Sequence, residues 1–218
     1  HMPGLQAKKL SLLYYKNSSL ALALDRLFVA CDKAYYAGAN ILILSDRGVD
    51  ENHIAIPSLL AVSAVQQYLV RTKKRTAISI ILESAEPRDV HHFATLFGYG
   101  ASAVNPYLAQ DCIGELIAGG ALNKDYYAAV DAYNKAILDG VMRIASKMGI
   151  SSMQSYEGAQ IFEAVGICKD VVDRYFTNTV SRVGGIGLQE INEAVLWRHD
   201  RAYDPMDLTA DLTVDSSG

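Results

Sequence analysis

Apolar and polar residues alternate in blocks along the first half of the chain, and the blocks predict strands followed by helices. Short runs that are apolar throughout are typical of strands covered on both faces in a parallel sheet. The strands are predicted at residues 10–15, 41–45, 77–82 and 102–105, and the helices between them at residues 20–38, 57–71 and 89–97. This alternation predicts parallel β/α units joined by crossover helices.

Beyond Pro106 the pattern becomes helical. Apolar residues at helical spacing predict one long helix over residues 126–148. Shorter helices are predicted around residues 158–165, 169–176 and 188–203, and no strand is predicted there. The expected fold class is therefore α/β: parallel β/α units, as in a doubly wound fold or part of an eight-stranded TIM barrel, followed by a helical C-terminal half.

Composition and charge narrow the possible partners. The chain has 218 residues, half of them apolar, and a formal net charge of -4 with both signs interspersed, so we expect no nucleic-acid partner. The apolar stretches are too short to predict a membrane span. Three widely spaced cysteines give neither a disulfide framework nor a metal-ligand set, which favours a cytoplasmic, reduced protein. Cys31 is predicted to be a buried structural residue.

A polar segment follows the second strand and holds the first candidate site residues: Asp46, Arg47, Asn52 and His53. The carboxyl ends of parallel strands are the usual functional edge of a β/α fold. Asp46 and Arg47 could form a ligand clamp, because a guanidinium binds a carboxylate or phosphate with two hydrogen bonds. The alternative, which we favour, is an internal salt bridge that holds the loop in place.

The segment after the third strand, residues 83–90, stands where phosphate-binding barrels present backbone amides to an anion. It contains Glu83 and Arg88 but no glycine, and its glutamates would repel an anion, so the sequence predicts that no phosphate binds there. Lys147 and Ser151 lie in a polar stretch after the long helix, which is either a turn or a site. No catalytic, cofactor-binding or metal-binding residue is assigned.

Several segments together resemble the large (alpha) subunit of bacterial glutamate synthase, over most of residues 10–203. The segments that carry the resemblance are residues 41–65, 83–94, 98–108, 146–151, 154–166 and 181–188. They match the later part of that subunit's central domain, which lies between a glutamine amidotransferase domain and an FMN-binding barrel. The resemblance implies an enzyme that makes L-glutamate from 2-oxoglutarate and glutamine-derived ammonia by FMN-mediated reduction, with NAD(P)H or ferredoxin as electron donor.

The resemblance also implies which parts of the family's chain are absent from this segment and which role the segment has. The central domain resembles a degenerate copy of the flavin barrel, so no cofactor is expected here; FMN and the iron–sulfur cluster belong to other parts of the family's chain. The segment is expected to be inactive in isolation and to support domain packing and the ammonia tunnel. Its partners would be the amidotransferase and FMN-binding domains. We expect residues 1–9 to be a tag remnant and lead-in, residues 10–203 the central-domain segment (β/α part 10–108, helical part 109–203), and residues 204–218 a flexible tail.

A different hypothesis is a free-standing flavin- or phosphate-binding β/α protein that uses Asp46, Arg47, Glu83 and Arg88 at one edge of the sheet. Under both hypotheses, the four predicted strands are only half of an eight-stranded barrel, so the sheet cannot close. Its unpaired strand edges would favour self-association unless helices cover them.

Overall fold

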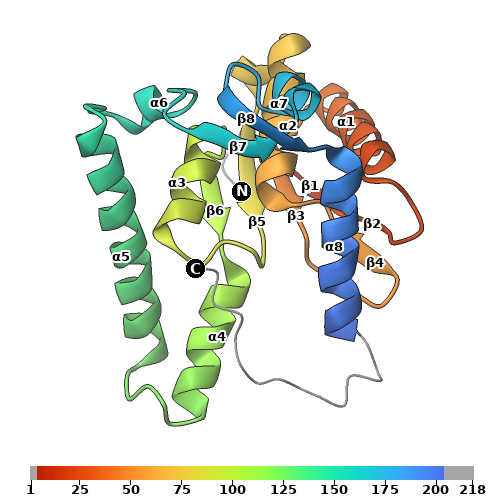
Figure 1. Ribbon diagram of the computed structural model, residues 1–218. Helices are drawn as coiled ribbons and strands as arrows, with labels where there is room; N and C mark the ends of the chain where they lie inside the picture. The colour runs from red at the N-terminus through yellow and green to blue at the C-terminus, as the bar shows by residue number, and fades with distance from the viewer. Residues whose placement is uncertain (1–3, 204–218) are drawn as a thin grey trace.

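The structure is a computed structural model that describes residues 4–203 of the 218-residue chain (Figure 1). The predicted tail at residues 204–218 lies outside the described residues. The strands are β1 (Ala7–Ser11), β2 (Leu13–Tyr15), β3 (Ile41–Ser45), β4 (His53–Ala55), β5 (Ser79–Glu83), β6 (Ala103–Asn105), β7 (Glu163–Ile167) and β8 (Val180–Ile186). The helices are α1 (Leu20–Tyr36), α2 (Ser58–Arg71), the short 3-10 helix η1 (Arg75–Ala77), α3 (Val90–Gly98), α4 (Tyr107–Ala118), α5 (Tyr126–Lys147), α6 (Met153–Tyr156), α7 (Lys169–Tyr175) and α8 (Leu188–Tyr203).

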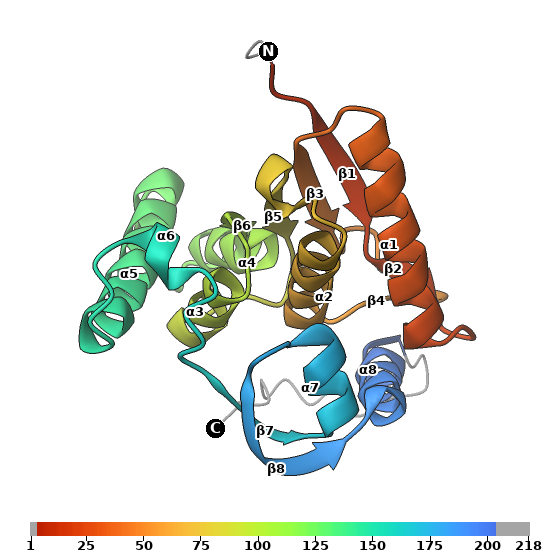
Figure 2. The same ribbon diagram turned by 90° about the horizontal axis from the view of Figure 1, so that it is seen from above.

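A four-stranded parallel sheet in the order β1-β3-β5-β6 forms the centre of the molecule. The connecting helices α1, α2 and α3 cover one of its faces (Figure 2). Alternate strand residues point into that interface and are fully buried, among them Leu42, Leu44, Ile80 and Leu82. The fold is therefore mixed α/β with a parallel sheet, as predicted. Within the described residues β1 and β6 are free edges, so the sheet is open and no closed barrel forms.

Local sequence explains where these elements begin and end. The Ser19 hydroxyl accepts a hydrogen bond from the Leu22 amide at the start of α1. The Asp89 carboxylate accepts from two amides at the start of α3. Both are favoured N-terminal capping residues. Gly38 follows α1 with φ +90°, a conformation that glycine adopts without steric cost.

The prediction for the first strand was partly wrong. Residues 10–15 do not form one strand, because Leu12 lies between β1, in the parallel sheet, and β2, which pairs antiparallel with β4. β1 also begins earlier than predicted, at Ala7. β4 was not predicted, because it has only three residues and begins at His53, the last residue of the polar segment after β3.

The prediction of a purely helical C-terminal half was also wrong. β7 and β8 form a two-stranded parallel pair joined by α7, and β7 overlaps the helix predicted at residues 158–165. β8 gives no apolar alternation, since every one of its residues is exposed and it contains Gly184 and Gly185. α7 and α8 lie where predicted, whereas α4 was missed.

Two further layers are built on the central sheet. α5 packs on α3 through Phe93, Ala94, Ile137 and Val141. The β7-α7-β8 unit lies on the other side of α2 from the sheet, and α8 lies beside α1 and β4 (Figure 2). The Ser63 hydroxyl in α2 donates to the Tyr175 carbonyl oxygen at the end of α7 over 2.5 Å.

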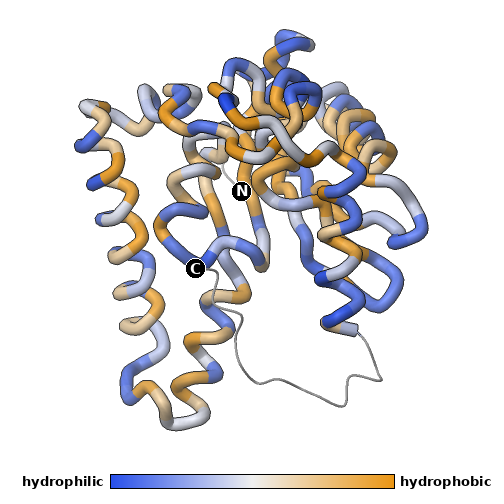
Figure 3. Tube along the Cα trace, viewed as in Figure 1, coloured by the Kyte–Doolittle hydropathy of each residue, from blue (hydrophilic) through white to orange (hydrophobic). Residues whose placement is uncertain are grey.

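Hydrophobic residues concentrate where the sheet meets α1 and α2, while α5 and α8 mix hydrophobic and hydrophilic residues along their length (Figure 3). α5 and α8 thus have the composition of surface helices. None of the helices in residues 4–203 has the length and apolar character that a membrane crossing requires.

Candidate functional site

The candidate site lies where β3 and β5 end at the same edge of the parallel sheet. The two strands are paired so that Ser45 stands beside Glu83. Asp46 and Arg47 follow Ser45, and Ser84 follows Glu83. The structure thus brings together three residues that the sequence singled out, namely Asp46, Arg47 and Glu83.

Glu83 is the centre of a charged cluster on the sheet face that the helices leave uncovered. Its carboxylate accepts from Lys9 Nζ at 2.7 Å, Ser45 Oγ at 2.6 Å and Arg47 Nε at 2.8 Å. Burial acts to raise the pKa of Glu83, but these donors, Lys9 first, outweigh it and lower the pKa to about 2. The carboxylate is therefore charged at neutral pH and is held by the chain's own groups.

Asp46 is buried, with 4% of its surface exposed, and it too is fully bound. Its carboxylate accepts from Ser84 Oγ at 2.6 Å, the Ala85 amide at 3.0 Å and the Tyr107 hydroxyl at 2.8 Å. Burial first, and then the hydrogen bond to Asp46, raise the pKa of Tyr107. A carboxylate with this set of donors is an anchor for the loop and is poorly placed to act as a base.

Arg47 links the two carboxylate clusters. Its guanidinium carbon lies 3.8 Å above the centre of the Tyr107 ring, a cation–π contact, while its Nε binds Glu83. Arg47 therefore pairs across the sheet with Glu83 and forms no ion pair with the neighbouring Asp46. Of the two predicted alternatives, the geometry is that of an internal salt bridge that holds the loop.

Asn52 and His53 lie apart from this cluster, at the start of β4. The Asp50 carboxylate accepts from the Asn52 amide at 2.8 Å and contacts His53 Nδ1 at 2.8 Å. The hydrogen bond from the Asn52 amide, followed by that from His53, lowers the pKa of Asp50. His53 also stacks on Tyr15, with ring centres 4.4 Å apart. These contacts order a turn, and none of those found in the described residues joins it to Glu83.

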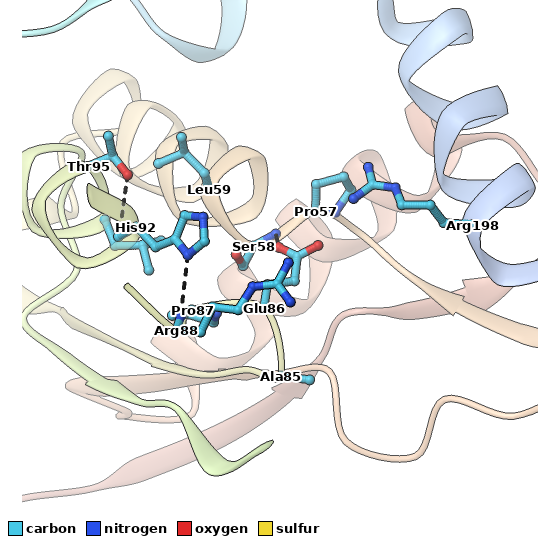
Figure 4. A pocket seen from close by; sticks show the side chains of 11 residues that line it. Pro57, Ser58, Leu59, Ala85, Glu86, Pro87, Arg88, His92, Thr95 and Arg198 are labelled. Carbon is cyan, nitrogen blue, oxygen red and sulfur yellow. Dashed lines mark hydrogen bonds between the residues drawn. The ribbon is translucent and has the colours of Figure 1, made fainter. Parts of the chain in front are cut away.

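Arg88 lines a cavity of about 440 Å³ between the start of α2, the segment after β5, and α8 (Figure 4). The carboxylate of Glu86 accepts from the Ser58 amide, the first residue of α2, at 2.7 Å. The Asp89 carboxylate occupies the start of α3 in the same way. Both helix N-termini at this edge are therefore occupied by side chains of the chain itself.

Lys147 and Ser151 are not part of this site. Lys147 is the last residue of α5 and Ser151 lies in the turn before α6; both are exposed. In Figure 1, α5 ends beside α6, away from the sheet edge at which β6 leads into α4. Within residues 4–203, no cluster of His, Cys, Asp or Glu has the composition of a metal site.

Sequence reasoning missed several members of the cluster. Tyr107 follows β6 at the same sheet edge, so its position after a strand was a usable signal. Ser84 lies directly after β5 and offered the same signal. Arg198 lines the cavity from α8, and no sequence signal indicated this, because only the folded chain brings α8 to the sheet edge.

Comparison with known proteins adds independent information. The model of the glutamate synthase central domain family matches residues 1–168. The glutamate synthase [NADPH] large chain of Bacillus subtilis (strain 168) is 50% identical over 201 residues, which is 92% of this chain and 13% of that protein. Ferredoxin-dependent glutamate synthase 2 of Synechocystis is 39% identical over 218 residues, covering 93% of this chain and 14% of that protein.

A eukaryotic relative shows the same relation. The glutamate synthase [NADH] of Schizosaccharomyces pombe is 36% identical over 206 residues, covering 92% of this chain and 10% of that protein. The chain thus spans only 10% to 14% of the length of these relatives. The family match covers most of the chain, so the chain belongs to the glutamate synthase central domain family.

Proposed function

We propose that this chain is a non-catalytic scaffold segment of a glutamate synthase. The whole protein would make L-glutamate from 2-oxoglutarate and glutamine-derived ammonia by FMN-mediated reduction. The segment would pack against the amidotransferase and FMN-binding domains and help to enclose the ammonia tunnel. The relatives are named for NADPH, NADH and ferredoxin, so the family match leaves the electron donor open.

The observation that carries this proposal is the saturation of the strand-end carboxylates. Glu83 and Asp46 stand where a β/α enzyme places its catalytic groups, yet each is bound by three donors of the chain itself. A general base needs to reach a substrate proton, and a nucleophile needs a free lone pair in the right direction. These carboxylates instead tie β3, β5 and the start of α4 together.

The topology supports a degenerate half-barrel. Adjacent strands follow one another along the chain, as in the first half of an eight-stranded barrel. A working phosphate site in such a barrel uses free amides at a helix N-terminus. Here Glu86 and Asp89 take up those amides at the starts of α2 and α3. This supports a segment without FMN and gives no support to a free-standing flavin-binding protein.

Exposed apolar surface supports the packing role. α4 has no buried residue although most of its side chains are apolar. Leu108 and Leu116 on α4 are 45% and 50% exposed, and Trp197 on α8 is 60% exposed. Apolar surface of this kind is typical of faces that meet another protein surface. The remaining length of the relatives supplies candidates for that surface.

Two measurements on the chain itself test the absence of a cofactor. After gentle purification, we expect no flavin absorbance. Millimolar FMN should leave the melting temperature unchanged, because a ligand of the folded state would raise it by mass action. Stoichiometric flavin, or a melting shift abolished by Arg47→Ala, would instead establish the flavin-binding alternative.

The packing role is tested in the full-length protein with Leu116→Asp on α4. We expect glutamine hydrolysis to continue while glutamate formation falls, because misplaced domains lose ammonia to solvent. Tyr36→Asp is the matched control: Tyr36 is 76% exposed at the end of α1, and its replacement should leave both rates unchanged. Equal loss of both activities, or of neither, in Leu116→Asp would contradict the role of this surface.

A further inference from the structure

Arginines from distant parts of the chain face the cavity at the sheet edge. Arg88 comes from the segment after β5, and Arg198 comes from α8. Figure 4 shows Arg198 extending from α8 toward the cavity, with Arg88 and His92 on the other side. Ser58, at the start of α2, also lines the space, whose volume is about 440 Å³. A cavity of this size suits a small metabolite.

The positive charge of this cavity is only partly neutralised by the residues that line it. Neither Arg88 nor Arg198 forms an ion pair among residues 4–203; Arg198 Nε has only a 3.4 Å contact with the Ala194 carbonyl oxygen of its own helix. Glu86 is the acidic residue of the lining, and its carboxylate is engaged by the Ser58 amide. Two arginines against one glutamate leave a net positive charge at the wall.

His92 adds a donor. Its Nδ1 accepts a hydrogen bond from the Arg88 amide at 3.3 Å, so the neutral ring carries its proton on Nε2. The ring is half-buried and lines the same cavity. The wall therefore offers guanidinium and imidazole N–H groups, together with the Ser58 hydroxyl, all of which suit an oxyanion.

The type of donor indicates which oxyanion. Phosphate sites in β/α folds rely on backbone amides at helix N-termini. The Ser58 amide is already used by Glu86, and the amides at the start of α3 are used by Asp89. The planar guanidinium groups that remain can form two parallel hydrogen bonds with a carboxylate or a phosphate, and the lack of free amides beside them favours the carboxylate. Arginines on opposite walls favour a ligand with a carboxylate at each end.

We propose that this cavity binds a small free dicarboxylate, with Arg88 and Arg198 holding its two ends. This site is independent of the scaffold role, which assigns no ligand to the chain. A chain without flavin can bind the dicarboxylate, and a chain that fails to bind it can still pack against other domains.

Titration calorimetry of the full chain with succinate at low salt tests the site. Succinate should bind more tightly than acetate, which has one carboxylate. Arg88→Gln and Arg198→Gln should each weaken succinate binding about tenfold, since each removes charge-assisted hydrogen bonds. Both side chains are exposed, so both variants should melt as the unaltered chain does. Arg143→Gln, at an exposed position on α5, is the matched control and should bind succinate normally.

Three results would overturn the assignment. The first is an absence of succinate binding in the millimolar range, or binding that neither arginine substitution weakens. The second is inorganic phosphate binding as tightly as succinate with the same dependence on Arg88 and Arg198, which would make the site a general anion site. The third is a glutamate-rich peptide displacing succinate at much lower concentration, which would make the cavity a docking site for an acidic protein segment.

Discussion

Glu83 remains ionised on the uncovered face of the sheet because Lys9, Ser45 and Arg47 all donate to it. A pKa of about 2 in the folded chain is below the ordinary glutamate value of 4.5. The unfolded chain therefore takes up its proton first as the pH falls. This residue stabilises the fold fully above pH 4.5, and its contribution is lost between pH 4.5 and about 2.

Glu83→Gln should lower the free energy of unfolding at pH 7 by about 2 kcal/mol, because it removes charge-assisted hydrogen bonds. The variant should also lose less stability than the unaltered chain between pH 4.5 and about 2. Urea denaturation at several pH values measures both effects. Glu163→Gln is the control: Glu163 pairs with Arg182 on the surface, and its loss should cost less than about 1 kcal/mol. Parallel pH profiles for Glu83→Gln and the unaltered chain would contradict this account.

Asp46 should behave as a buried structural acceptor. Asp46→Asn should destabilise the fold by roughly 2 kcal/mol, because one acceptor oxygen becomes a donor that faces the donor of either Ser84 or Tyr107. Tyr107→Phe, which removes one hydrogen bond, should cost about 1 kcal/mol. The double variant should cost less than the sum, since the two side chains contact each other. Thermal or urea denaturation of the three variants tests this, and strict additivity would speak against it.

For individual residues, the sequence predicted which side chains lie close together, but it did not predict which of them bind each other. Asp46, Arg47 and Glu83 could be predicted because parallel strands bring their carboxyl ends to one edge. That Arg47 binds Glu83 depends on the register of β3 with β5, which no spacing encodes. Lys147 and Ser151 were singled out by residue type alone, and the fold places them elsewhere.

At the scale of helices and strands, the close contact between α3 and α5 depends on a glycine, which has no side chain. Gly140 lies in the middle of α5, and a Cβ there would lie 2.6 Å from Cγ1 of Val90, closer than such atoms approach. Gly114, in α4, also lies within a helix, but a Cβ there would lie 3.6 Å from the Tyr126 ring, an ordinary contact.

Gly140→Ala should therefore destabilise the chain by about 1 kcal/mol, because overpacking outweighs the gain in helix propensity. Gly114→Ala should instead stabilise it by up to about 1 kcal/mol. Replacing glycine with alanine should thus change stability in opposite directions in the two helices. Melting temperatures are enough to measure both changes. If both variants gained stability, the close packing of α3 on α5 would be wrong.

The elements that sequence could predict are those with a strong internal pattern. β3, β5, α1, α2 and α5 have continuous apolar runs or long helical stripes and were found close to their actual bounds. β7 and β8 were missed because an exposed two-stranded pair needs no apolar face, and Gly185 approaches the backbone of Gly166 there. Such strands are defined by their pairing, which lies outside any local pattern.

For the whole molecule, the exposed β8 strand is a surface that the isolated chain leaves open. Its Val183 is 56% exposed, and β8 has one paired neighbour within the described residues. Unpaired edges of this kind add strands from other chains. We expect the isolated chain to associate with increasing concentration, as measured by light scattering.

Val183→Lys should reduce that association, because a charged side chain on an edge strand opposes pairing. Val29→Lys is the matched control, since Val29 is 54% exposed on α1 and offers no edge. Equal suppression by both variants would point to general charge effects, and a strictly monomeric unaltered chain would show that the edge is not used.

The contacts of α8 with the first β/α unit set the order in which the fold can be completed during synthesis. The Tyr14 hydroxyl binds Asn192 at 2.8 Å, His199 Nε2 binds the Asp50 carbonyl oxygen at 2.7 Å, and the Tyr203 hydroxyl donates to the Val49 carbonyl oxygen at 3.0 Å. Residues of the first β/α unit are thus synthesised well before the α8 residues that bind them. A nascent chain can assemble the parallel sheet early, but the loop after β3 gains these partners only once α8 has emerged.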